Sequence, residues 1–162
     1  MRGMSAESSG IADLPMRLLI TAVLMSLSVP ILWGAYQDLS TTMTVSEIEE
    51  RARELLDTIE ILVSGGEGSS VRKEVRLRSY GSSSIEEMRI GSPLGSDSVE
   101  GYAVVYVVSG HGRSILALDP PVRMISDDHG RGMVLHEGIS YLELVHVILE
   151  GEHCVVVRFA ED

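Results

Sequence analysis

The sequence predicts an α+β fold, in which an N-terminal transmembrane helix precedes an amphipathic helix that packs on an antiparallel β-sheet. Three observations predict it: an apolar run at residues 14–36, a stripe of apolar side chains at helical spacing, and alternation of apolar and polar residues from residue 71 onward. We accordingly divide the chain into four parts: a short polar leader at 1–13, a transmembrane helix at 14–37, a linker and amphipathic helix at 38–66, and an extracytoplasmic antiparallel β domain at 67–162.

The apolar run is 23 residues long and contains a single charged residue, Arg17. The hydrocarbon core of a bilayer is about 30 Å thick and needs roughly 20 apolar residues in a helix. The stem of Arg17 can lie along the hydrocarbon while its guanidinium reaches the interface. Pro30 removes one amide donor and is expected to bend the helix. Trp33 and Tyr36 follow at the far end, where amphipathic rings prefer to lie.

We expect this helix to be a retained anchor, because the run is too long for a secretory signal and no small-x-small exit follows it. The distribution of basic residues favours one orientation in the cell membrane. Arg2 and Arg17 lie on the N-terminal side, whereas the first basic residues beyond the helix are Arg51 and Arg53. We therefore expect a single-pass protein with a cytoplasmic N-terminus and an extracytoplasmic β domain.

Composition narrows the possible partners. The net charge is −11, and most of it lies in the expected outer part. Binding of phosphate needs a positive surface, so we expect no nucleic acid as a partner. Cys154 is the chain's one cysteine, so an intrachain disulfide is excluded and the domain must be held by packing.

The amphipathic helix has clear start and stop signals. Ser46 and Glu49 have the spacing of a capping box, and Gly65-Gly66 is expected to end the helix. The Thr-rich residues 37–45 could either continue the first helix weakly or break it. Glu47–Arg51 and Glu49–Arg53 form i,i+4 pairs on the polar side. The apolar side is a narrow stripe of Val45, Ile48, Ala52, Leu55, Ile59 and Leu62.

This stripe must be buried against something. A sheet of the same chain is the favoured partner, because the stripe is shorter than a sustained coiled coil requires. A helix of a neighbouring subunit is the alternative.

The rest of the chain reads as strands and turns. Alternation and turn residues predict strands at 71–80, 85–90, 99–108, 113–118 and 133–136 and a hairpin of 139–149 with 154–160. Residues 99–108 are apolar on both faces, which predicts an interior strand. A type II′ turn at Gly151-Glu152 would place Ile148 opposite Val155, His146 opposite Val157 and Leu144 opposite Phe159. In that register Leu144, Ile148, Val155, Val157 and Phe159 face the core, together with His146, which we expect to be neutral there.

No pattern of catalytic, cofactor-binding or metal-ligating residues emerges. The phosphate-binding, dinucleotide-binding, serine-hydrolase and zinc-protease motifs are missing from the sequence. Asp127, Asp128 and His129 with His136 and Glu137 match no zinc or calcium spacing. His111, His129 and His153 lie in predicted turns, where solvated histidines are ordinary. We expect neither an enzyme nor a cofactor.

The order of parts, a short polar leader, a long apolar helix, an amphipathic helix and an antiparallel sheet, resembles type IV pilins and, more closely, the pilin-like proteins of archaea. The resemblance implies that a peptidase cuts after a glycine before the apolar helix, and that an acid near the new N-terminus pairs with a neighbour's amine. Gly3 before Met4, with Glu7 as the acid, is one candidate. Gly10 before Ile11, with Asp13 as the acid, is the other. A proline in the apolar helix, here Pro30, is likewise common in that family.

Two functions follow as expectations. The first is a pilin-like surface protein anchored in the membrane, a subunit or minor subunit of a type IV filament, with lipid and either itself or other pilin-like subunits as partners. The alternative is a single-pass, membrane-anchored β domain that binds a ligand or a partner protein without assembling.

Overall fold

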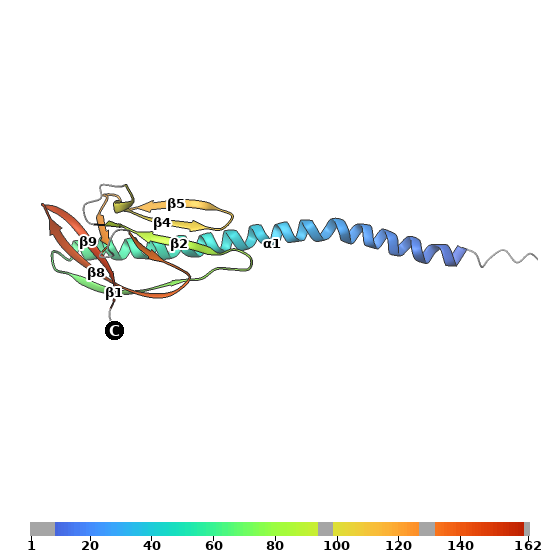
Figure 1. Cartoon of the computed structure of the whole chain (residues 1–162), viewed down its shortest axis with the longest axis horizontal. Helices are drawn as coiled ribbons and strands as arrows, with labels where there is room; N and C mark the ends of the chain where they lie inside the picture. The colour runs from blue at the N-terminus through green and yellow to red at the C-terminus, as the bar shows by residue number, and fades with distance from the viewer. Residues whose placement is uncertain (1–8, 94–98, 127–131, 161–162) are drawn as a thin grey trace, which may run out of the picture. The chain divides into compact units, whose positions relative to one another are not determined.

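The computed structural model describes residues 9–93, 99–126 and 132–160. The one α-helix within these ranges is α1, which runs Ser9–Ser64, and the strands follow it in the sequence (Figure 1). The chain divides into two compact units, one up to Asp38 and one from Leu39 onward, and each is described by itself. The architecture is α+β, as the sequence predicts.

α1 begins earlier than predicted and has no boundary inside it. It starts at Ser9 instead of residue 14, and it continues through residues 37–45, so the predicted start at Ser46 is wrong. Tertiary contacts explain the continuity. Ser40 and Thr44 are buried, and the hydroxyl of Thr44 accepts a hydrogen bond from the Tyr80 amide (2.9 Å). These contacts outweigh the weak helix propensity of the Thr-rich stretch.

The helix ends where the two glycines predict. The Gly65 amide donates to the carbonyl of Ile61 (3.1 Å), and the Gly66 amide donates to that of Val63 (3.2 Å). Gly66 has a φ of +90°, a left-handed conformation that glycine adopts without steric cost. The stop signal is therefore confirmed.

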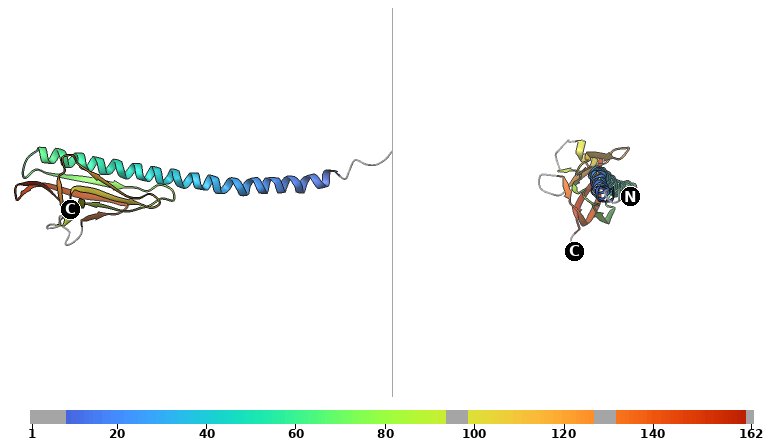
Figure 2. Two further views of the ribbon diagram at one scale, coloured as in Figure 1. Left: turned by 90° about the horizontal axis from the view of Figure 1, so that it is seen from above. Right: turned by 90° about the vertical axis from the view of Figure 1, so that its right-hand side faces the viewer.

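The strands form two sheets (Figure 2). The five-stranded sheet has the order β1-β8-β9-β6-β3, and the four-stranded sheet has the order β5-β4-β2-β7. The elements after α1 are β1 (Ser70–Leu77), β2 (Ile85–Ile90), β3 (Ser92–Pro93), the 3₁₀ helix η1 (Val99–Tyr102), β4 (Ala103–Val108), β5 (Gly112–Ala117), β6 (Arg123–Ser126), β7 (Met133–Leu135), β8 (Gly138–Leu149) and β9 (Glu152–Phe159).

Most predicted strands are confirmed within a few residues, and three details differ. β4 lies between β5 and β2 and is buried on both faces, as predicted for 99–108. The first four residues of that predicted strand form η1 instead. β3 and β6 were not predicted. β6 pairs in parallel with β3 and β9, so the five-stranded sheet is mixed and not purely antiparallel. The predicted turn at 127–132 lies, apart from Gly132, outside the described residues.

The C-terminal hairpin forms, but its turn and register differ from the prediction. Leu149 pairs with Glu152, so the two-residue loop is Glu150-Gly151, with φ of +52° and +87°. Two positive φ values are typical of a type I′ turn, not the predicted II′. The register moves by two residues, and His146 lies opposite Val155.

A two-residue shift keeps every side chain on its face, because strand side chains alternate with period two. Leu144, Val155 and Val157 are therefore buried as predicted. The prediction that Ile148 and Phe159 are also buried is wrong. Ile148 lies beside the turn and is 40% exposed, and Phe159 lies at the end of β9 and is 51% exposed.

The core of the second unit lies between α1 and the two sheets. The predicted helix stripe is confirmed, since its residues are 0–6% exposed: Ile48, Ala52, Leu55, Ile59 and Leu62. They share one cluster with Val75 and Leu77 of β1, with Leu142 and Leu144 of β8, and with residues of the other sheet. The stripe is therefore covered by the chain's own sheets.

Candidate functional site

The apolar part of α1 is the first candidate site, because its large apolar side chains are exposed all round. Leu18, Leu19 and Leu24 are 67%, 64% and 59% exposed, and at 3.6 residues per turn they point to three different sides of the helix. Among the described residues, α1 is the one helix with a stretch long and apolar enough to cross a membrane. Such a surface is costly in water and favourable in hydrocarbon.

The hydroxyl groups of this segment are satisfied inside the helix. Thr21 donates to the carbonyl of Arg17 (2.9 Å), Ser26 to that of Val23 (2.8 Å) and Ser28 to that of Leu24 (2.7 Å). None of the three hydroxyls needs water. This is the arrangement that a hydrocarbon environment requires, because an unsatisfied polar group there costs several kcal/mol, on the order of 2–7 kcal/mol.

The four predicted anchor residues all lie on α1. Arg17 lies near the start of the apolar segment and Pro30 lies inside the helix, where it offers no amide to the carbonyl four residues earlier. The rings of Trp33 and Tyr36 are 5.8 Å apart between centroids and are 58% and 47% exposed. The pair presents an indole and a phenol side by side at the end of the apolar segment.

The two predicted processing positions differ in what the structure describes. Gly3, Met4 and Glu7 lie outside the described residues. Gly10, Ile11 and Asp13 belong to α1, so the bond between Gly10 and Ile11 lies in the first turn of the helix.

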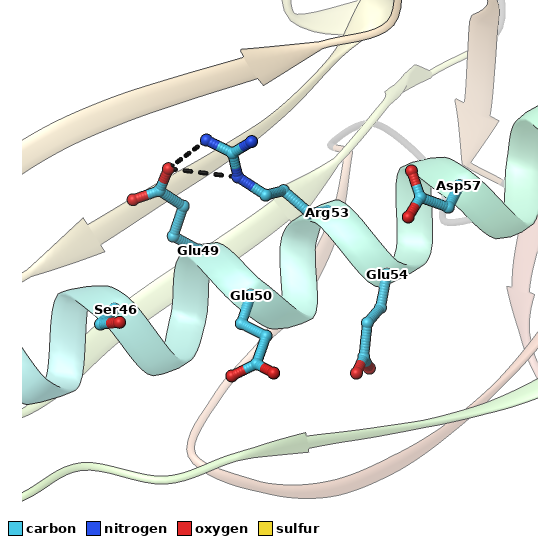
Figure 3. Close-up of a pocket in the computed structure, with 6 residues that line it drawn as sticks. All are labelled: Ser46, Glu49, Glu50, Arg53, Glu54 and Asp57. Carbon is cyan, nitrogen blue, oxygen red and sulfur yellow. Dashed lines mark hydrogen bonds and ion pairs between the residues drawn. The ribbon is translucent and has the colours of Figure 1, made fainter.

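The second candidate site is the polar side of α1 in the second unit. A shallow concavity there is lined by Ser46, Glu49, Glu50, Arg53, Glu54 and Asp57 (Figure 3). The predicted i,i+4 pairs are confirmed. Arg53 donates to Glu49 (2.6 Å), and Arg51 bridges Glu47 (3.1 Å) and Glu54 (3.0 Å). Hydrogen bonds to Glu54 and Glu47 raise the pKa of Arg51 further above its ordinary value.

This acidic surface has no catalytic arrangement. Figure 3 shows Glu50 and Glu54 pointing to one side of the helix and the Glu49–Arg53 pair lying on the other. The concavity is open to solvent, and none of the lining residues is a nucleophile held by a base. Its chemistry is that of a charged surface, which can attract cations or a basic partner.

The third candidate site is a pair of histidines that the hairpin register brings together. The Nε2 atom of His146 lies 2.9 Å from the Nδ1 atom of His153, and the rings stack with centroids 5.1 Å apart and 22° between planes. His146 is fully buried, whereas His153 is exposed on β9. Within the described ranges, the Nδ1 atom of His146 has no hydrogen-bond partner.

The sequence placed His153 in a turn and did not join it to His146. With His146 opposite Val155, the two histidines become diagonal neighbours on one face. Two imidazoles alone make a poor metal site, and no group of three or more His, Cys, Asp or Glu side chains gathers in the part of the chain that the structure describes. The pair can share one proton through an N–H···N bond.

Comparison with known proteins assigns no family to the chain. No protein-family model matches it, and neither a curated protein nor a solved structure matches it. The functional argument therefore rests on the apolar segment of α1, the acidic concavity and the histidine pair.

Proposed function

We propose that the chain is a pilin-like surface protein held in the cell membrane by the apolar part of α1, with its β domain on the extracytoplasmic side. The observation that carries the proposal is a helical segment that is apolar on every side and whose hydroxyls bond to its own backbone. A water-exposed helix needs a polar face, and this segment has none between residues 18 and 36.

The energetics of insertion support the anchor. Between residues 16 and 36 the sequence holds five Leu, two Ile and two Val. Each contributes roughly 0.3–0.6 kcal/mol near the bilayer centre, so together they favour insertion by about 3–5 kcal/mol. Arg17 lies close to one end, where its guanidinium can reach the headgroups. Trp33 and Tyr36 provide the amphipathic rings of the opposite interface.

The order of parts supports a place in a type IV filament, as a subunit or a minor subunit. The polar leader with two glycine-containing candidate cleavage positions supports processing before assembly. The basic residues Arg2 and Arg17 support a cytoplasmic N-terminus.

A second function has one observation in its favour. The stripe Ile48 to Leu62 is already covered by the chain's own sheets, so it is not free for a helix of a neighbouring subunit. This favours a self-contained β domain on an anchor, which binds a ligand or partner protein without assembling.

The anchor is tested by washing membranes that contain the full-length protein with alkaline carbonate. We expect the native protein to stay with the lipid and Leu24→Arg/Leu27→Arg to be released. Ile139→Arg, which changes an exposed residue of the β domain, is the control and should stay bound. Release of the native protein would refute the anchor.

The filament is tested separately by sequencing the N-terminus of the protein taken from cells. A mature end at Met4 or Ile11 supports processing and therefore a pilin-like role. A mature end at Met1, together with a monomer in detergent and in nanodiscs, leaves the self-contained anchored domain.

A further inference from the structure

β1 is a basic strand at the edge of the five-stranded sheet. All eight of its residues pair with β8 on one side, and the sheet order ends at β1 on the other. Residues 71–78 carry four cations and one anion, in a chain with 13 basic residues and a net charge of −11. Nearly a third of the basic residues are therefore concentrated in β1 and the residue that follows it, Arg78.

Three of these cations have no ion-pair partner among the described residues. Arg76 pairs with Glu74 (2.8 Å). Arg72, Lys73 and Arg78 make no ion pair with any described residue, and the side chains of Arg72 and Arg78 are exposed. Lys73 is half-buried on the inner face of the strand. Within the described ranges, these three positive charges are therefore not neutralised by an ion pair.

The outer face of α1 is the counterpart. Glu50, Asp57 and Glu60 are exposed and fall within one side of the helix, given a turn of 3.6 residues. None of the three forms an ion pair within the described part of the chain, because Arg51 and Arg53 are engaged by other glutamates. No ion pair joins these acids to the cations of β1 in the described residues.

The two surfaces match in length as well as in sign. Glu50 to Glu60 spans about 15 Å along a helix at 1.5 Å per residue. Arg72 to Arg78 spans about 20 Å along a strand at 3.3 Å per residue. We propose that the basic edge strand β1 of one copy docks on the acidic outer face of α1 in a second copy.

The proposed contact is heterologous, because each copy uses two different surfaces. Such contacts repeat head to tail and generate rings or filaments. Exposed ion pairs are individually weak, but anchors confined to one membrane raise the effective concentration of the partners. This docking rests on the proposed function in one respect only, namely that both copies are anchored in the same membrane.

The test uses full-length protein in neutral phosphatidylcholine vesicles, with energy transfer between copies labelled at an added C-terminal cysteine in a Cys154→Ser background. The acid-face variant is Glu50→Lys/Asp57→Lys, and the strand variant is Arg72→Glu/Arg78→Glu. A swapped variant carries all four changes and keeps the native net charge. The control, Glu150→Lys/Glu152→Lys, makes the same change of charge as the acid-face variant at the exposed β8–β9 turn.

We expect the acid-face and strand variants to lose association at least tenfold, and the control to keep it. The swapped variant should associate with itself as the native chain does, but should not associate with the native chain. Raising the salt concentration from 0.15 to 1 M should weaken all of these contacts, because the Debye length falls from about 8 to 3 Å.

Four outcomes would overturn the docking proposal: no association of the native chain, equal loss in the control, no rescue in the swapped variant, or undiminished association of the strand variant. The last would mean that the cations only protect the sheet edge from pairing. If the strand variant instead loses binding to anionic vesicles while copies still associate, the strand's partner is lipid. Carbonate resistance of the same samples reports the anchor independently, so the failure of one proposal is distinguishable from that of the other.

Discussion

The two histidines of the hairpin should respond to mutation with opposite signs, although they share one hydrogen bond. His153→Ala removes the partner of the buried Nε2 atom of His146 and leaves both ring nitrogens of His146 without one. His146→Leu removes the buried ring itself. The exposed His153 that remains can then bond to water.

The magnitudes follow from burial. An unsatisfied buried polar group costs about 1–3 kcal/mol, and a typical hydrogen bond contributes about 0.5–1.5 kcal/mol net. His153→Ala should therefore lower the free energy of unfolding by about 1–3 kcal/mol. His146→Leu loses the bond but also removes the unpaired Nδ1 atom, so its free energy of unfolding should range from unchanged to about 1 kcal/mol higher.

A double-mutant cycle isolates the coupling. In the His146→Leu background, His153→Ala should change the free energy of unfolding by less than about 0.5 kcal/mol, because nothing buried depends on His153 any longer. The measurement is urea unfolding of residues 39–162 near pH 7.5, followed by circular dichroism. If His146→Leu lowers the free energy of unfolding by more than about 2 kcal/mol, the imidazole makes a contact that this reasoning lacks.

Three further outcomes follow from burial. Residues 39–162 should fold and stay soluble without the anchor, since they form one compact unit; aggregation of this fragment would show that the core needs the first unit. In that fragment Leu55→Ala should cost about 2–5 kcal/mol and the control Ile61→Ala under about 0.5 kcal/mol, because Leu55 is 0% and Ile61 72% exposed. Equal effects in unfolding experiments would contradict the assigned stripe. Burial raises the pKa of the Cys154 thiol, so the free energy of unfolding should hold below the ordinary thiol pKa and fall as pH rises through the raised value; Cys154→Ala should show a flatter curve.

The sequence predicts the elements better than their boundaries. The stripe from Ile48 to Leu62 repeats at helical spacing, and the structure buries it as that spacing requires. The helix start at Ser46 failed for a different reason. A capping box is a local signal, whereas the burial of Ser40 and Thr44 depends on contacts with residues far along the chain. Ser40 and Thr44 are polar, so a search for apolar residues at helical spacing does not find them.

Among the candidate sites, too, those that depend on local spacing are predicted and those that depend on distant contacts are not. The Glu47–Arg51 and Glu49–Arg53 pairs depend only on helical spacing and are predicted correctly. The histidine pair depends on the register of β8 with β9, and the sequence put that register two residues away. Parallel pairing of β6 with β9 has no sequence signal of its own, because alternation does not specify which strand lies next to which.

The pairing of β1 with β8 has a consequence for synthesis. β1 lies directly after α1 in the chain, yet the one strand that holds it in the described sheet ends at residue 149. At about 5–20 residues per second, the ribosome needs roughly 4–16 s to proceed from Leu62 to Leu142. During that interval the apolar stripe of α1 lacks the core residues of β8 and β9 that share its cluster. A nascent chain whose anchor is already in the membrane must therefore keep this stripe out of contact with other chains until β8 and β9 emerge. Truncations near the C-terminus should be far more damaging than their length suggests.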